Sequence, residues 1–355
     1  MKPRPRSLYG LAAGLGAPFL MSWTSRMDRR ILLACLLAVL MVGNVLTALV
    51  DAYPLVLLAR LCMGFANGLF WAIGVGTAVR LVPGQLAGRA SAIVLSGISI
   101  AAVAGVPLGT LMGNVTGWRA AFLAWGGLSL LSLLAVLATL PRLPSQGGFA
   151  VAQVLALPVR NTLLRRVVIA MFLLVLGHFA AYTYARPWLE ESTMATPTFI
   201  VIVLIVFGVG GAVGNIVGGR LAEKRPGWFF AVASGGVLLA VLLLPTVSWS
   251  LWLVVLVLTL WGFAFGASNV AEVKVVLTAA PSAFEAAMSI NTLAYNTSLA
   301  LGALAGGMLV DLVGVDGAIV LAAVICALSL AAQACLRTWA DRMPADSSES
   351  ADVLA

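Results

Sequence analysis

Three side chains that could bind a ligand or titrate share one helical face in the region 166–188. His178, Tyr182 and Arg186 are spaced i, i+4 and i+8, which places them on one side of a helix. An imidazole and a phenol there can stack on a ring and form hydrogen bonds to it. His178 is the only histidine, and it could titrate between about pH 5 and 8 or be a buried structural residue. We expect His178 and Tyr182 to line a cavity, and His178 is a candidate for proton transfer.

Arg60 is a charged side chain within an apolar stretch, followed by Gly64 and Gly68. An arginine inside a membrane span costs about 2.5–3.5 kcal/mol on insertion scales. We therefore expect Arg60 to face a water-filled cavity. The alternative is that its long side chain reaches the outer membrane surface, because Arg60 lies near the start of its stretch.

Several other polar or aromatic residues lie within apolar stretches, where such side chains face protein or water. The candidates for ligand contact are Asn67, Trp71, Ser96, Ser99, Trp261, Asn291, Tyr295 and Ser298. Glu272 and Lys274 are expected at the membrane interface, so no acid within a span is an evident proton carrier. The four cysteines have no metal-binding spacing, and we expect neither a metal nor a cofactor.

The composition requires these residues to be positioned by membrane helices. Charged residues make up 10% of the chain and hydrophobic residues 62%, and the mean hydropathy is +1.07. A soluble domain with this balance would have an apolar surface. A polytopic enzyme would need clustered carboxylates, histidines or a nucleophile pair, which the chain lacks. Loops near anionic lipid explain the net charge of +8 better than nucleic-acid binding does.

Eleven apolar stretches have lengths close to the roughly 20 residues that cross a bilayer as a helix. They are 8–25, 31–50, 54–79, 90–115, 118–140, 166–188, 198–221, 228–246, 250–273, 286–310 and 316–336. Barrel strands would alternate polar and apolar residues, so we predict an all-α membrane protein.

The basic residues predict the orientation of these helices. If Arg26, Arg29 and Arg30 are cytoplasmic, nearly all other loop arginines and lysines also lie inside, and only Arg119 and Arg186 lie outside. This predicts a multi-pass protein of the bacterial inner membrane with a cytoplasmic C-terminus. Lys2, Arg4 and Arg6 before the first stretch disagree with this scheme. A missing first helix would explain the disagreement, and a signal peptide is the alternative.

An internal repeat divides the chain into two halves. Gly64 and Gly68 recur as Gly262 and Gly266, about 198 residues later, and a further set recurs in the same order: Gly105, Gly109 and Gly117 as Gly302, Gly306 and Gly314. Such a repeat indicates two homologous bundles. We predict a bundle at 1–140, a cytoplasmic linker at 141–165, a six-helix bundle at 166–338 and a disordered tail at 339–355.

The second half begins near Arg165, so its counterpart should begin about 33 residues before Met1. We therefore expect a twelve-helix protein without its first helix. A mis-started or non-functional fragment is the alternative.

These motifs resemble the major facilitator superfamily, and within it the bacterial drug and sugar efflux proteins of the proton-antiporter type. The resemblance covers Leu8 to about Leu336. It implies that Arg60, with Gly64 and Gly68, takes part in proton coupling. It also identifies the exporters' glycine-rich helix, whose residues here are Gly97, Gly105, Pro107, Gly109 and Gly113.

The resemblance also implies a charged loop that latches the cytoplasmic side. Its first copy contains Arg26, Arg29 and Arg30, with Ser25 where the family has an acid. Its second copy contains Gly219, Glu223 and Arg225, with Glu223 as the acid. The alternative is that these arginines only anchor the loops on the cytoplasmic side.

Taken with the resemblance, the sequence predicts a secondary active transporter that exports a small molecule in exchange for protons. Relatives in the family export arabinose-like sugars, purine nucleosides and chloramphenicol-like drugs. The expected partners are this substrate, protons and the lipid bilayer, and the expected state is a monomer without nucleic acid. Uptake instead of efflux remains open, because alternating access works in either direction.

Overall fold

The computed structural model describes residues 23–24, 26–83, 105–144 and 151–334, with positions 86, 90, 93–94, 97 and 101. Within these residues, nine helices are long and apolar enough to cross a membrane. Each corresponds to one predicted stretch. The stretch 8–25 lies almost wholly outside the described residues, and 90–115 does so in large part. The all-helical membrane fold is therefore confirmed, whereas the count of eleven stays a prediction.

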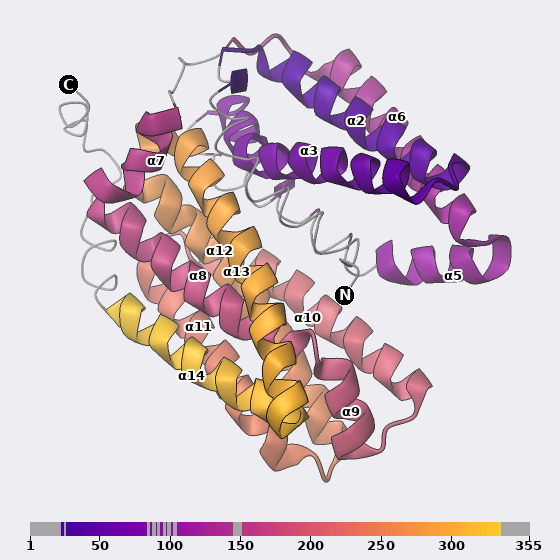
Figure 1. Ribbon diagram of the computed structural model, residues 1–355. Coiled ribbons are helices and arrows are strands. Elements are labelled where there is room, and N and C mark those ends of the chain that lie inside the picture. The colour runs from indigo at the N-terminus through magenta and orange to yellow at the C-terminus, as the bar shows by residue number, and fades with distance from the viewer. Residues whose placement is uncertain are drawn as a thin grey trace. The chain divides into compact units, whose positions relative to one another are not determined.

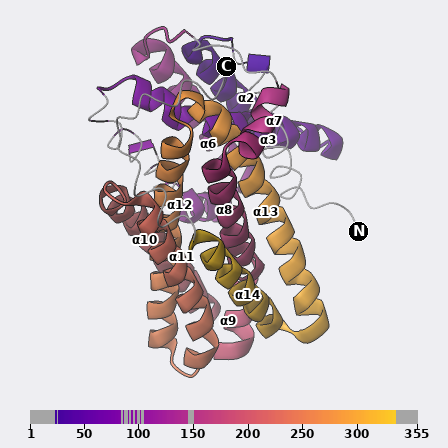
Figure 2. The same ribbon diagram turned by 90° about the vertical axis from the view of Figure 1, so that its left-hand side faces the viewer.

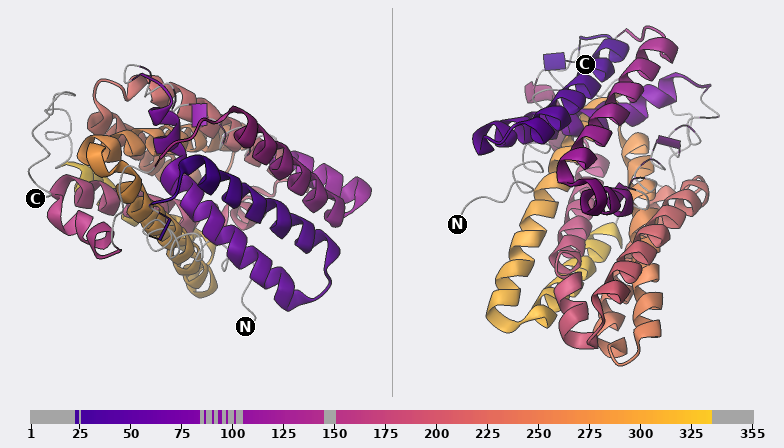
Figure 3. Two further views of the ribbon diagram at one scale, coloured as in Figure 1. Left: turned by 90° about the horizontal axis from the view of Figure 1, so that it is seen from above. Right: turned by 90° about the vertical axis from the view of Figure 1, so that its right-hand side faces the viewer.

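The chain divides into two compact units. The first unit comprises Met1–Leu81, Ala104–Ala156 and Glu285–Thr297. It contains α2 (Arg29–Leu49), α3 (Tyr53–Arg80), α5 (Val106–Thr116) and α6 (Trp118–Thr139). In this unit α2 packs along both α3 and α6 (Figure 3). One cluster of its buried apolar residues consists of Leu32, Leu33, Leu36, Ala66, Leu69, Ala72 and Ile73.

The second unit comprises Val82–Val103, Leu157–Phe284 and Ser298–Ala355. Its helices are α8 (Thr162–Tyr182), α9 (Ala185–Thr193), α10 (Pro197–Leu221), α11 (Pro226–Leu243), α12 (Leu251–Ala279), most of α13 (Phe284–Val313) and α14 (Val315–Ala334). The helix α12 packs against α10 and α11, and α14 packs against α8 and α11 (Figures 1 and 2). The predicted boundaries of the two bundles and the linker stay predictions, and the predicted tail 339–355 lies outside the described residues.

Polar residues at the loop–helix junctions fix where several spans begin. Asp28 precedes α2 and accepts a hydrogen bond from the backbone N–H of Arg30. Asn161 does the same for α8, across 2.9 Å from the N–H of Leu164. Such caps satisfy N–H groups that have no partner within the helix. In lipid this matters more than in water, because unsatisfied backbone groups are costly there.

Two glycines that the repeat pairs also share a backbone conformation. Gly117 ends α5 with φ +88°, and Gly314 ends α13 with φ +86°. A side chain would strain the backbone at such a positive φ. Each glycine therefore lets one helix stop and the next begin at once, with α6 starting at Trp118 and α14 at Val315. The same junction thus occurs once in each half of the sequence.

Glycines allow α10 and α12 to approach closely. A Cβ built on Gly214 would lie 2.0 Å from the carbonyl oxygen of Phe263, and one built on Gly262 would lie 2.1 Å from that of Phe207. Neither distance leaves room for a methyl group. The two backbones are in contact along this seam, as small residues permit between membrane helices.

The predicted linker 141–165 contains a helix that the sequence analysis did not anticipate. This helix, α7 (Val151–Arg160), has an interior proline at Pro158. It buries Val154 and Leu157 while Leu155 and Val159 are exposed. The segment is therefore amphipathic in this part, and its apolar residues were overlooked because the glycines and prolines before it are typical of a loop.

Candidate functional site

An aromatic cluster forms in the second unit where α8, α10 and α12 meet. Its members are His178, Phe179, Tyr182, Phe207, Trp261 and Phe265. The close α10–α12 seam brings them together, since Gly262 lets the backbone at Phe207 reach α12. Three of the sequence-predicted site residues, His178, Tyr182 and Trp261, therefore lie side by side.

His178 lies inside this cluster, and 1% of its surface is exposed. Its ring is parallel to that of Phe265, with the ring centroids 3.5 Å apart. Its Nδ1 accepts a hydrogen bond from the indole Nε1 of Trp261 across 3.0 Å. Because an indole nitrogen can only donate, Nδ1 carries no proton and the imidazole is neutral with its proton on Nε2. The geometry makes His178 a support for the neighbouring rings.

Tyr182 forms the partly exposed edge of the cluster. Its ring stacks on Phe207 with the centroids 4.6 Å apart, and it lies parallel to His178 at 5.2 Å. Its hydroxyl and ring face are the groups of the cluster best suited to meet a ligand, because its neighbours His178 and Trp261 are almost fully enclosed.

Arg186 does not belong to this face, which corrects the expectation of one continuous helix over 166–188. The helix α8 ends at Tyr182, and α9 starts at Ala185 after a two-residue turn. Beyond the turn, Arg186 forms an ion pair with Glu190 across 2.8 Å, with 66% of its side chain exposed. The i, i+4, i+8 pattern assumed unbroken helical geometry, and the turn removes its third member.

Arg60 lies in the first unit, on α3. Its guanidinium carbon is 4.6 Å from the ring centre of Phe122 on α6, a distance at which a cation–π attraction operates. The side chain is half-buried, and Gly64 and Gly68 on the same helix are buried. Arg60 therefore packs against a neighbouring helix of its own unit.

The remaining predicted contact residues are distributed between the units. Asn67 and Trp71 on α3 are half-buried in the first unit, and Asn291 and Tyr295 belong to the segment of α13 grouped with that unit. Ser298 is buried in the second unit. Ser96 and Ser99 lie outside the described residues.

The glycine-rich helix differs between the two repeats. In the first, Gly97 and Gly113 have no neighbour within 4 Å of a built Cβ, and Gly105 and Gly109 face only the ring of Trp125. Pro107 lies in the first turn of α5. In the second repeat, Cβ atoms built on Gly302 and Gly306 would overlap the α8 carbonyl oxygens of Leu176 and Ala180. Tight packing is thus observed at the second copy.

The charged loop before α2 has an ionic partner that the sequence analysis missed. Arg29 is buried and forms an ion pair with Glu285 at the start of α13. Its guanidinium also donates to the carbonyl oxygen of Thr24 across 3.2 Å. Arg26 is exposed, and Arg30 donates to the carbonyl oxygen of Leu137. Glu285 stands far away in sequence, so only the fold could pair it with this loop.

The second copy of the loop is organised differently. Glu223 and Arg225 are exposed, whereas Gly219 is buried and its carbonyl oxygen accepts a hydrogen bond from Lys274 on α12. The acid that best fitted the family pattern is therefore at the surface of its unit. The buried ion pair occurs at the copy that lacks its own acid.

The expected place of Glu272 at the membrane interface stays a prediction. Within the protein, Glu272 on α12 is buried, with only 4% of its surface exposed. Its burial follows from packing against neighbouring helices, which a linear sequence does not display. Among the described residues, no group of three or more histidine, cysteine or acidic side chains could hold a metal ion.

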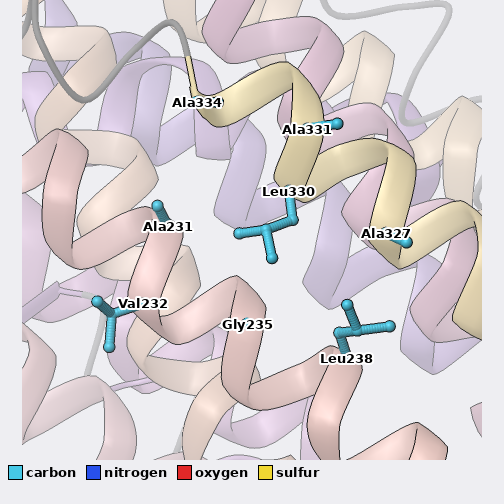
Figure 4. A pocket seen from close by; sticks show the side chains of 8 residues that line it. All are labelled: Ala231, Val232, Gly235, Leu238, Ala327, Leu330, Ala331 and Ala334. Carbon is cyan, nitrogen blue, oxygen red and sulfur yellow. The ribbon is translucent and has the colours of Figure 1, made fainter.

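An apolar groove of about 480 Å³ lies between α11 and α14 (Figure 4). It is lined by Ala231, Val232, Gly235, Leu238, Ala327, Leu330, Ala331 and Ala334. None of these side chains has a polar atom, so the groove offers a sugar or nucleoside no side-chain hydrogen bond. Leu239 and Leu328 on the same two helices are about half exposed, as expected of a surface that faces lipid.

A family model described as "Major Facilitator Superfamily" matches residues 7–283 and again residues 167–353. The "Probable sugar efflux transporter" of Helicobacter pylori strain ATCC 700392 / 26695 is 31% identical over 306 residues, which cover 86% of this chain and 78% of that protein. The "Uncharacterized MFS-type transporter YtbD" of Bacillus subtilis is 30% identical over 330 residues, covering 90% and 83%.

Two solved structures have a similar fold. The human organic anion transporter MFSD10 (TETRAN) matches with a TM-score of 0.75 at 19% identity, covering 92% of this chain and 82% of that one. A variant of the Escherichia coli fucose:proton symporter FucP matches with a TM-score of 0.73 at 14% identity, covering 93% and 89%. Because the sequence identities are this low, these two structures show a similar fold and nothing about the substrate.

Proposed function

Because the chain belongs to the Major Facilitator Superfamily, we propose that it is a proton-coupled exporter of a sugar-like small molecule. The observation that carries this proposal is the aromatic cluster around Tyr182. A sugar ring has apolar faces that stack on aromatic rings and hydroxyl groups that form hydrogen bonds. Tyr182 offers both interactions at the accessible edge of the cluster. The name of the Helicobacter pylori relative, a probable sugar efflux transporter, supports the same substrate class.

The proposed transport cycle needs residues that couple transport to protons and residues that close the cytoplasmic side. We assign proton coupling to Arg60, because ionisable residues within membrane spans usually mark a pathway for substrate, ions or protons. We assign the cytoplasmic latch to the pair of Arg29 and Glu285. In this proposal the pair forms in the outward-facing state and separates when the cytoplasmic side opens. His178 then has the supporting role that its contact with Trp261 favours.

The basic loops support one orientation of the protein in the membrane. Excess arginine and lysine in loops marks the cytoplasmic side, which places the start of α2 and the C-terminus in the cytoplasm of a bacterial cell. The protein then exports substrate as protons enter across the inner membrane, and it does so as a monomer.

Accumulation of labelled arabinose, adenosine and chloramphenicol in cells that express the full chain tests the proposal. Expression should lower arabinose accumulation, and a protonophore should abolish this effect. Arg60→Ala should also abolish the lowered arabinose accumulation, whereas a change at the exposed Arg160, Arg160→Ala, should leave it as in the wild type. Raised arabinose accumulation would indicate uptake, and an unchanged level of all three probes would overturn the proposal. An effect on adenosine or chloramphenicol alone would replace the sugar by that compound.

A further inference from the structure

The apolar groove between α11 and α14 lies close to the first residue of α11 and the last residue of α14 (Figure 4). Its lining spans 231–238 on α11 and 327–334 on α14, which is about 10 Å along each helix. One leaflet contributes half of the roughly 30 Å hydrocarbon core. The groove therefore fits within the leaflet on the side where α11 begins, and its volume of about 480 Å³ has room for part of an acyl chain.

Trp228 marks the membrane interface at this end of the groove. It is exposed, and it shares a face of α11 with the lining residue Val232, because the two are four residues apart. Tryptophans gather where the hydrocarbon meets the lipid headgroups. Trp249 and Trp252 are exposed beyond the other end of this span, and the helical segment 228–247 between them measures about 30 Å. The groove thus lies directly inside the interface at Trp228.

Basic residues stand just outside this interface. Arg225 directly precedes α11, Lys224 precedes Arg225, and both side chains are exposed. The start of a helix adds backbone N–H groups and a partial positive charge, which favour an anion. Glu223, the acid of the same loop, interacts electrostatically with Lys274 on α12. The end of the groove is therefore positively charged, which complements an anionic headgroup.

We propose that the groove binds an anionic phospholipid. One acyl chain lies along the apolar lining, and the phosphate of the headgroup lies against Arg225, Lys224 and the start of α11. In the proposed orientation this is the cytoplasmic leaflet, where anionic lipids attract basic segments next to membrane helices. This lipid site is independent of the transported substrate and of proton coupling.

A second copy of the chain fits the groove less well than a lipid does. Small residues such as Gly235 and Ala331 allow membrane helices to approach closely. In a symmetric pair, however, each copy brings the same residues to the same depth. Arg225 and Lys224 of the two copies would then lie near one another, and like charges at a contact are unfavourable. A lipid matches both the apolar lining and the basic end.

Native mass spectrometry of the purified full chain in detergent tests the headgroup. The probes are phosphatidylglycerol and phosphatidylcholine with identical acyl chains. The wild type should bind phosphatidylglycerol at one saturable site, about tenfold or more tightly than phosphatidylcholine. Arg225→Gln should weaken phosphatidylglycerol binding about fivefold, the effect of one basic residue near anionic lipid. Arg160→Gln, at an exposed arginine of α7, should leave this binding unchanged.

Filling the groove tests the position of the acyl chain. Gly235 is suited to this, because a Cβ built there meets Cδ2 of Leu330 at 4.0 Å, an ordinary van der Waals contact. Gly235→Leu should fill the groove and weaken phosphatidylglycerol binding by about tenfold. Gly127→Leu is the matched control, since no atom lies within 4 Å of a Cβ built there, and it should bind like the wild type.

Three results would overturn the proposal. Equal binding of the two lipids would show that the groove takes no anionic headgroup. A preference for phosphatidylglycerol that survives either Arg225→Gln or Gly235→Leu would place the lipid elsewhere on the protein. A dimer of the wild type that Gly235→Leu converts to a monomer would show that a second copy covers the groove.

A measurement on the wild type avoids dependence on the folding of the variants. Phosphatidylglycerol with a photoreactive diazirine on one acyl chain is added to the full chain and irradiated. Peptide mass spectrometry should find the adducts on 231–238 and 327–334, and unlabelled phosphatidylglycerol should reduce them about tenfold. Adducts spread evenly over the exposed helices, or adducts that unlabelled lipid does not reduce, would contradict the proposal.

Discussion

A Cβ built on Gly266 of α12 would lie 2.1 Å from the backbone carbonyl oxygen of Gly211 on α10. The two helix backbones therefore touch at this point, and backbone atoms cannot move aside as a flexible side chain can. This contact holds α12, which carries Trp261, Phe265 and Glu272, against α10, which carries Phe207. The position of the aromatic cluster depends on it.

Gly266→Ala should therefore destabilise the protein, because a methyl group forces the helices apart. Overpacking of this kind costs about 1–3 kcal/mol. The apparent melting temperature of the purified protein in detergent should fall. Gly127→Ala is the matched control, since no atom lies within 4 Å of a Cβ built there. An equal melting temperature for Gly266→Ala and the wild type would show that the seam is looser than described.

Removal of the indole donor to His178 should cost stability through one hydrogen bond. Trp261→Phe leaves the buried Nδ1 without its partner, which costs about 1–3 kcal/mol. His178→Phe removes the acceptor, and the double variant should lose less than the sum of the two single losses. Thermal unfolding of the four proteins measures this coupling. Strict additivity would contradict the hydrogen bond.

Tyr182 should contribute to substrate affinity through its ring more than through its hydroxyl. Tyr182→Ala should raise the arabinose concentration for half-maximal counterflow by about tenfold or more, because stacking is lost. Tyr182→Phe keeps the ring and should have an effect of only a few fold. Tyr53→Ala, a change at an exposed tyrosine of the first unit, should leave the value unchanged. An equal value for Tyr182→Ala and the wild type would remove Tyr182 from the site.

Loss of either partner of the ion pair between Arg29 and Glu285 should lower the stability of the protein. Arg29→Ala leaves a carboxylate without its cation, and Glu285→Gln leaves a buried guanidinium without its anion. Breaking a buried pair in this way costs about 3–5 kcal/mol. The exchange of Arg29→Glu with Glu285→Arg should restore part of the melting temperature. Failure of the exchange to improve on either single reversal would argue against direct pairing.

The sequence alone predicted the parts of the molecule that depend on local composition and repetition. Stretches of about 20 apolar residues must be helical in lipid, because each backbone N–H and C=O then finds a partner within its own segment. The nine described spans correspond to predicted stretches for this reason. The repeat also predicted that Gly117 and Gly314 are equivalent, and their shared positive φ agrees with that.

Tertiary structure decided which side chains meet. The sequence placed Arg186 on the face of His178, yet the turn after Tyr182 separates them. It offered no partner for Arg29, yet the fold brings Glu285 to it from 256 residues away. It also did not show that packing encloses Glu272. Helical periodicity specifies the face on which a residue lies, whereas its neighbour and its exposure depend on which helix covers that face, and only the packed bundle determines this.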